Sequence, residues 1–185
     1  MLRIAVIGTS GAGKTTFATK LAAKCGIDAI DLDQINWRPN WYDRYRHEDE
    51  NFFADVATAT NEENWVIAGA YSGVRSLIWQ RATHLVWLDL PKSVIMRQVI
   101  IRSLKRAIDG KDVFLGCRED WRRLLNKDHP IRIAWDTFDK RRAKFEEMLG
   151  ESEYSHLKLF RCFDKAQVLD ALAKLSDLYS NQSLT

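Results

Sequence analysis

The sequence predicts an α/β fold in which a five-stranded parallel sheet carries helices on both faces. Short apolar runs rich in β-branched residues alternate along the chain with longer segments of helical periodicity. The first apolar run leads directly into a glycine-rich loop and a helical segment. With 185 residues, of which 46% are hydrophobic and 29% charged, the chain has the size and composition of one globular domain. We therefore expect a single domain over residues 1–185.

Five segments are predicted to be strands of a parallel sheet, and the first of them is a continuous, β-branched apolar run typical of a strand buried on both faces. They are residues 2–7, 27–32, 65–68, 84–90 and 156–160. Gly8, Gly69 and Pro91 follow or end three of these segments and mark where the strands stop. Since the carboxyl ends of parallel strands meet at one edge of the sheet, we expect a ligand to bind beyond that edge.

The segments between the strands have the periodicity of helices with one apolar side. Helices are predicted over residues 15–24, 48–60, 72–80, 91–108, 118–125, 131–149 and 164–178. Pro91 suits the first turn of its helix, and Asp164 with Gln167 forms a capping box for the last one. Residues 109–112 are predicted to form a turn, and residues 180–185 a frayed tail.

The loop after the first strand reads Gly-Thr-Ser-Gly-Ala-Gly-Lys-Thr over residues 8–15, which fits the phosphate-binding pattern GxxxxGK[ST] at every fixed position. Glycines let successive backbone N–H groups curl around phosphate oxygens, and the next helix directs its positive end at the same anion. Lys14 supplies charge to the β- and γ-phosphates, and Thr15 a hydroxyl for magnesium. We predict that this P-loop binds ATP and Mg²⁺ through Gly8, Ser10, Gly11, Ala12, Gly13, Lys14, Thr15 and Thr16.

Other classes of function have weaker support. A net charge of +3 does not argue for nucleic-acid binding, and no nucleic-acid-binding motif is present. In the NKxD motif with which GTPases bind guanine, an acid stands at the last position, whereas residues 126–129 place His129 there. The 3 cysteines lack the spacing of metal or disulfide sites, and no apolar run approaches the roughly 20 residues that cross a membrane. We expect a cytoplasmic monomer or homodimer without nucleic-acid or membrane partners.

Two carboxylates stand at the end of the second predicted strand. Asp31 and Asp33 follow Lys14 at about the distance that returns the chain, after one helix, to the ligand-binding edge of the sheet. If the strand continues, both side chains point the same way, because side chains alternate with period two. One can then hold a magnesium-bound water while the other orients or deprotonates an acceptor hydroxyl. We assign Thr15 and Asp33 to the metal and Asp33 also to catalysis.

Arginines cluster in the second half of the chain. Arg102 and Arg106 are four residues apart and share one helix face, and Arg118, Arg122 and Arg123 follow after a short polar loop. Arginines stabilise the charge that spreads over a transferring phosphoryl group. A helix–loop–helix over about residues 102–123 would form a lid that closes over the phosphates and expels water. The catalytic candidates are Lys14, Asp33, Arg106 and Arg118.

Several segments together resemble one family. They are the phosphate loop, the Asp-x-Asp strand end, the loop Trp37-Arg38-Pro39-Asn40-Trp41, the segments 65–71 and 84–91, and Gly116-Cys117-Arg118-Glu119. Over nearly its whole length the chain resembles adenylate-kinase-like P-loop proteins of the DNA topology modulation protein group. The resemblance implies a P-loop NTPase of nucleoside-monophosphate-kinase-like fold with a small lid, which binds ATP. Relatives phosphorylate nucleotides, shikimate, gluconate and other small molecules, so the acceptor stays open.

The resemblance also implies roles for particular residues. Arg102 and Arg106 fall on its lid helix, with Arg102 toward ATP, and the loop that begins at Arg161 falls where relatives pack the adenine. Ala68 stands where many relatives carry an acid, and Ala70 where Asn is usual. The first departure removes a carboxylate from the magnesium shell.

Two hypotheses about function follow. In the first, the protein is an ATP-dependent kinase whose acceptor lies between Asp33, Tyr71 and the tryptophan loop, residues 37–42. In the second, it is an ATP-binding regulatory or hydrolytic switch without a phospho-acceptor. Trp37, Trp41 and Tyr42 either stack on the acceptor or pack the loop onto the domain.

Overall fold

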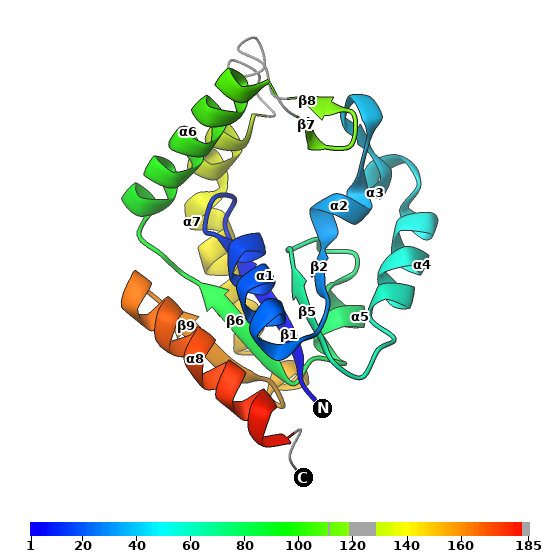
Figure 1. Cartoon of the computed structure of the whole chain (residues 1–185), viewed down its shortest axis with the longest axis vertical. Helices are drawn as coiled ribbons and strands as arrows, with labels where there is room; N and C mark the ends of the chain where they lie inside the picture. The colour runs from blue at the N-terminus through cyan, green and yellow to red at the C-terminus, as the bar shows by residue number, and fades with distance from the viewer. Residues whose placement is uncertain (111, 119–128, 183–185) are drawn as a thin grey trace.

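The structure is a computed structural model that describes residues 1–110, 112–118 and 129–182. Its centre is a sheet of 5 parallel strands in the order β2-β5-β1-β6-β9 (Figure 1). These strands are β1 (Arg3–Gly8), β2 (Ala29–Asp31), β5 (Trp65–Ala68), β6 (His84–Leu88) and β9 (Lys158–Cys162). The first strand therefore lies in the middle, and its last residue, Gly8, pairs with Leu88 of β6. This arrangement places the phosphate loop at the centre of the carboxyl edge of the sheet.

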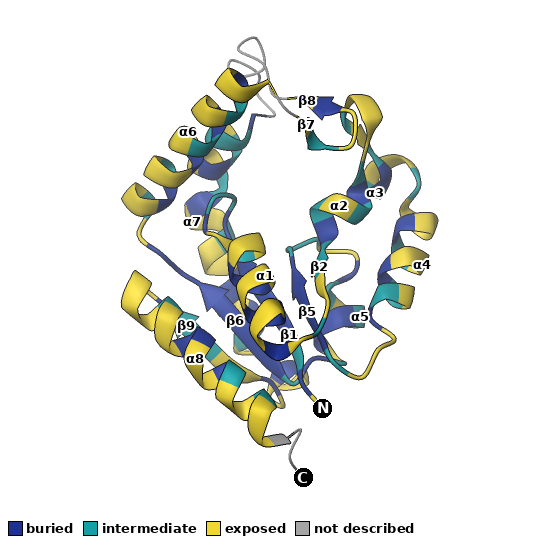
Figure 2. Cartoon of the chain, viewed as in Figure 1, coloured by how far each residue is buried: buried dark blue, intermediate teal, exposed yellow. Residues whose placement is uncertain are grey.

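Helices cover both faces because side chains of each strand alternate between two hydrophobic clusters. The helices are α1 (Lys14–Cys25), α4 (Asp49–Ala59), α5 (Arg75–Trp79), α6 (Lys92–Asp109), α7 (Pro130–Leu149) and α8 (Lys165–Gln182). Even-numbered β1 residues such as Val6 pack toward α1 and α8, whereas Ile7 packs toward α4, α5 and α7. Figure 2 shows β1, β5 and β6 buried between these layers. Helix α6 packs along α7 beyond the carboxyl edge.

Two smaller units complete the described chain. Between β2 and α4 lie α2 (Leu32–Asn36), β3 (Trp37–Arg38), the 3-10 turn η1 (Pro39–Trp41), β4 (Tyr42–Asp43) and α3 (Arg44–His47). After α6, β7 (Asp112–Phe114) and β8 (Cys117–Arg118) form an antiparallel hairpin. A further 3-10 turn, η3 (Ser152–Tyr154), joins α7 to β9. None of the helices in the described part of the chain is long and apolar enough to span a membrane.

The predicted α/β fold is confirmed, and several predicted boundaries are wrong for local reasons. The second strand ends at Asp31, because its carboxylate accepts the amide of Asp33 and starts α2. The helix predicted over 72–80 begins only at Arg75, and the amide of Gly73 donates to the Tyr45 hydroxyl ahead of it. The predicted strand 156–160 is displaced to 158–162.

The helix predicted over 118–125 does not begin at Arg118. That residue lies in β8, where the Asp112 carboxylate accepts from the Gly116 amide at 2.9 Å and from Arg118 Nε at 2.8 Å. Gly116 has φ +71°, which allows the tight turn between the two strands. The remainder of that helix, with Arg122, Arg123 and the far part of the expected lid, falls outside the described residues, as do Lys111 of the expected turn and residues 183–185 of the tail.

Candidate active site

The phosphate loop curls between β1 and α1 on glycines that other residues cannot replace. Gly8, Gly11 and Gly13 have φ of +147°, +87° and +94°. A Cβ on Gly8 would lie 2.8 Å from the Leu88 carbonyl oxygen, and one on Gly11 would lie 3.0 Å from Cβ of Val99. No side chain caps the first turn of α1, and that turn contains no acid. Its N–H groups are therefore available to an anion.

Lys14 is the first residue of α1, and its ammonium group folds back over the loop. Its Nζ donates to the Thr9 carbonyl oxygen at 3.2 Å. Burial lowers the lysine pKa to about 8, and the positive charges of Arg141 and Arg102 lower it as well, against the opposing effects of Asp33 and Asp31. Cations and carboxylates thus surround Lys14, and a bound polyphosphate would add the negative charge that keeps it protonated.

The two carboxylates have different partners. Thr15 Oγ1 donates to Oδ2 of Asp31 at 2.9 Å, and the amide of Asp33 donates to Oδ1 of Asp31 at 3.0 Å. Burial, and then the charge of Asp33, raise the pKa of Asp31. Asp31 therefore contacts the Thr15 hydroxyl, which is predicted to bind magnesium, whereas Asp33 lies in the first turn of α2. The expectation that both side chains point the same way from one strand is wrong, because the strand ends between them.

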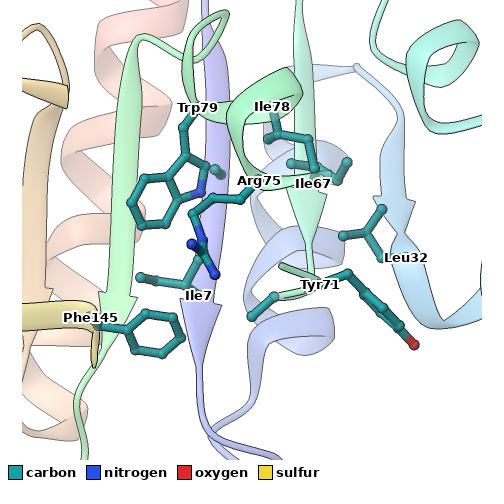
Figure 3. A pocket seen from close by; sticks show the side chains of 11 residues that line it. Ile7, Leu32, Ile67, Tyr71, Arg75, Ile78, Trp79 and Phe145 are labelled. Atoms are coloured by element: carbon teal, nitrogen blue, oxygen red, sulfur yellow. The ribbon is translucent and has the colours of Figure 1, made fainter. Parts of the chain in front are cut away.

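Tyr71, which follows β5, holds Asp33 from the other side. Its hydroxyl donates to Oδ1 of Asp33 at 2.7 Å, and its ring packs against those of Tyr45 and Phe52 at centroid distances of 5.3 and 5.2 Å. Burial and the charge of Asp33 raise the pKa of the Tyr71 phenol well above its usual range, so the phenol stays a donor. In Figure 3 this hydroxyl points away from a small pocket that is lined by Ile7, Trp79 and Arg75 among others.

Arg141 of α7 is a site residue that the sequence analysis missed. It belongs to the inward stripe of the helix, whose other members are buried: Ala134, Phe138, Phe145 and Met148. Its guanidinium is half-buried, and burial lowers its pKa while Asp33 and Tyr71 oppose that shift. Arg141 forms no ion pair with another described residue. A single charge on an otherwise apolar helical stripe is the signal that could have identified it.

The predicted lid arginines are in different positions. Arg102 of α6 is half-buried, and it lies near enough to Lys14 for its charge to lower the pKa of that lysine. Arg106 follows one turn later on α6, toward the β7–β8 hairpin. Arg118 pairs with Asp112, its side chain is 74% exposed, and Figure 1 shows its strand apart from the phosphate loop.

Arg161 lies within β9 and not in the loop after it. Its guanidinium donates to Oδ2 of Asp89 at 2.9 and 2.6 Å, contacts Glu146, and lies 4.0 Å from the centroid of the Trp87 ring. Arg142 pairs with the other oxygen of Asp89, whose side chain is 3% exposed. Both oxygens of Asp89 are thus engaged by arginines, which indicates a structural ion pair beside the expected adenine region.

The residues present fit a magnesium ion held jointly with a nucleotide. Among the described residues no group of three or more His, Cys, Asp or Glu side chains could hold a metal ion. Magnesium instead takes one or two carboxylates together with substrate phosphates and water. The Thr15 hydroxyl and the Asp31 carboxylate, 2.9 Å apart at the phosphate loop, offer suitable oxygens.

The sheet order and the phosphate loop define the fold class as that of P-loop kinases. The structure is similar to shikimate kinase from Acinetobacter baumannii in complex with shikimate, with a TM-score of 0.55 and 16% identity over 100% of this chain and 96% of that chain. It is also similar to a gluconokinase from Sinorhizobium meliloti, with a TM-score of 0.52 and 17% identity over 99% and 96%. A third similar structure is that of an uncharacterized protein from Eubacterium ventriosum, with a TM-score of 0.51 and 17% identity over 96% of this chain and 99% of that chain.

These similarities confirm the predicted P-loop fold. At identities of 16 and 17% they show the fold alone. No protein-family model matches the chain, and no curated protein matches it. The narrower resemblance to the DNA topology modulation group therefore stays a prediction.

Proposed function

We propose that the protein is an ATP-dependent kinase that transfers the γ-phosphoryl group of ATP to a hydroxyl of a small-molecule acceptor. The observation that carries this proposal is that Asp31 and Asp33 have different partners on opposite sides of the site. Asp31 is engaged by Thr15 on the phosphate side, while Asp33 is held by Tyr71 beside Arg141 on the other side. A hydrolase needs only to position a water molecule. The Asp33 carboxylate, fixed by Tyr71 and near the positive charge of Arg141, instead suits the binding of a second substrate.

Each residue has a distinct role in the proposed transfer. Lys14 and Arg102 bind the phosphates, and Thr15 and Asp31 hold magnesium, which would neutralise phosphate charge. Asp31 thus takes the metal role that was predicted from the sequence for Asp33, because Asp31 is the acid in contact with Thr15. Asp33 orients the acceptor hydroxyl and takes its proton. The acceptor oxygen then bonds to the γ-phosphorus as the bond to the bridging oxygen breaks, and that electron pair leaves with ADP. In this scheme Arg106 and Arg118 keep the transfer roles predicted from the sequence. The role of Arg118 requires the β7–β8 hairpin to approach the phosphates.

The names of the structural neighbours, shikimate kinase and gluconokinase, are those of small-molecule kinases and support the proposal. A cytoplasmic location and a monomeric or homodimeric state stay predictions.

The alternative function, a regulatory or hydrolytic ATP switch, is supported by one feature of the site. Ala68, at the end of β5, is buried and offers no carboxylate to the magnesium shell.

The deciding experiment is a screen of nucleosides, nucleotides, sugar acids and cyclic polyol acids for phosphorylated product, followed by ³¹P NMR. With the acceptor identified, Asp33→Asn should lower kcat by about 10²-fold or more while the ATP affinity changes little, because the acid–base group is lost. Asp28→Asn is the matched control, since Asp28 is exposed and precedes β2 at its other end.

Two results would reject the kinase. One is ATP hydrolysis without product across the screen, which would favour the switch. The other is an Asp33→Asn variant as active as Asp28→Asn.

A further inference from the structure

Two segments about 75 residues apart in the chain meet beyond the carboxyl edge of the sheet. One is the tryptophan loop, and the other is the β7–β8 hairpin, residues 112–118 (Figure 1). The Asn40 amide donates to the Gly116 carbonyl oxygen at 3.0 Å, and Trp41 Nε1 donates to the Arg118 carbonyl oxygen at 2.9 Å. These two bonds place Arg118 by its backbone, independently of its side chain.

Packing supports the same contact. Cys117 is fully buried, and its Sγ donates to the Arg38 carbonyl oxygen at 3.0 Å. The Trp41 ring meets that of Phe114 edge-on, with 6.1 Å between centroids. Gly116 lies so close to Pro39 that an added Cβ would be 2.8 Å from the proline Cβ and 3.1 Å from its Cα. The two surfaces therefore fit one another closely, and only glycine fits at the tip of the hairpin.

The tryptophan loop is strained where it makes this contact. Asn40 and Trp41 have φ of +61° and +60°, a left-handed conformation that Asn tolerates and Trp rarely adopts. A left-handed Trp is strained and persists only when its surroundings hold it. Here the partners that hold both residues are on the hairpin, so each segment stabilises the observed conformation of the other.

The same loop connects rigidly to Asp33. Helix α2 contains both Asp33 and the fully buried Asn36. Asn36 Nδ2 donates to Oδ1 of Asp43 at 3.1 Å, and Asn36 Oδ1 accepts from the Tyr45 amide at 2.7 Å. The two ends of the tryptophan loop are thus fastened together beside the proposed acceptor position. A displacement of the hairpin would move the loop, and a displacement of the loop would act on α2.

We propose that Trp41 is a positioning residue that fastens the hairpin, and Arg118 with it, to the acceptor side of the site. The loop and the hairpin then move as one body, so that placement of Arg118 depends on the tryptophan loop. The consequence for turnover rests on the proposed function, whereas the contact itself does not.

The first test requires no activity. Trp41→Phe keeps an aromatic ring beside Phe114 and removes the indole donor together with part of the ring. Loss of one hydrogen bond should raise amide exchange at Asn40 by about 2- to 10-fold. Gly116→Ala, which introduces both a clash and an unfavourable φ, should raise it further. Arg118→Ala is the matched control, because the carbonyl group that accepts from Trp41 remains. The ion pair with Asp112 that this variant loses is exposed and contributes little, so exchange at Asn40 should rise less than in Trp41→Phe.

The second test measures turnover with the acceptor found in the screen. Trp41→Phe should lower kcat without changing the KM for ATP, and Trp41→Phe combined with Arg118→Ala should be no slower than Arg118→Ala alone. Unchanged exchange in Trp41→Phe would overturn the contact. Faster exchange with an unchanged kcat, or additive effects in the double variant, would overturn the positioning role. Failure to find any acceptor would reject the proposed function and leave the exchange result valid.

Discussion

The hydrogen bond from Tyr71 to Asp33 gives the sharpest test of how the site works. Tyr71→Phe removes the hydroxyl and keeps the ring in its cluster with Tyr45 and Phe52. The bond is 2.7 Å long and its acceptor is a carboxylate. Hydrogen bonds to charged groups contribute about 1.5–3 kcal/mol, and about 1.4 kcal/mol corresponds to a factor of ten in rate.

If the bond is needed to orient Asp33 during transfer, Tyr71→Phe should lower kcat by about 10- to 100-fold. The KM for ATP should stay the same, because the phosphate loop makes no contact with the lost hydroxyl in the described structure. Steady-state kinetics at saturating ATP, with thermal unfolding measured in parallel, provides the assay.

Tyr45→Phe is the control for the loss of a phenol in the same cluster. The Tyr45 hydroxyl bonds to Ser72 Oγ at 3.0 Å and accepts from the Gly73 amide at 3.2 Å, without touching Asp33. Equal losses of kcat in the two variants would refute the reasoning, since both would then report the packing of the cluster. A loss in Tyr71→Phe that comes only from a raised KM for the acceptor would place Tyr71 in binding and not in the transfer step.

Two further predictions concern protonation. Burial lowers the Lys14 pKa to about 8, and bound phosphates favour the charged form, so ATP affinity should fall by up to tenfold per pH unit above about pH 8. Calorimetric titration from pH 7 to 9.5 would measure this dependence. An unchanged affinity, or the same dependence in Lys14→Ala, would contradict the prediction. Burial lowers the pKa of His84, so protons bind the unfolded chain preferentially as pH falls through about 6.5, and the free energy of unfolding should decrease there. In denaturant titrations between pH 7.5 and 5.5, His84→Gln should show a weaker decrease than the unaltered protein. Parallel curves for the two proteins would exclude His84 as the cause.

The central sheet and the phosphate loop were predictable because their determinants are local. Most of the strands are short runs dominated by apolar residues, and the residues that surround the phosphates are consecutive, so no long-range information was needed. The strand boundary at Asp31 was not predictable in the same way. Asp-Leu-Asp fits either a continuing strand or a helix start, and the bond from the Asp33 amide to the Asp31 carboxylate selects the second.

The sequence by itself determined that this chain forms a P-loop α/β fold, with its phosphate loop after the first strand. The tertiary structure alone decided which side chains converge on that loop. Tyr71 reaches Asp33 across 38 residues of chain, and Trp41 reaches the Arg118 carbonyl across 77. Arg141 enters through the packing of α7 against the sheet. The physical reason is that such contacts depend on strand order and helix packing, which distant residues establish together and which no local pattern encodes.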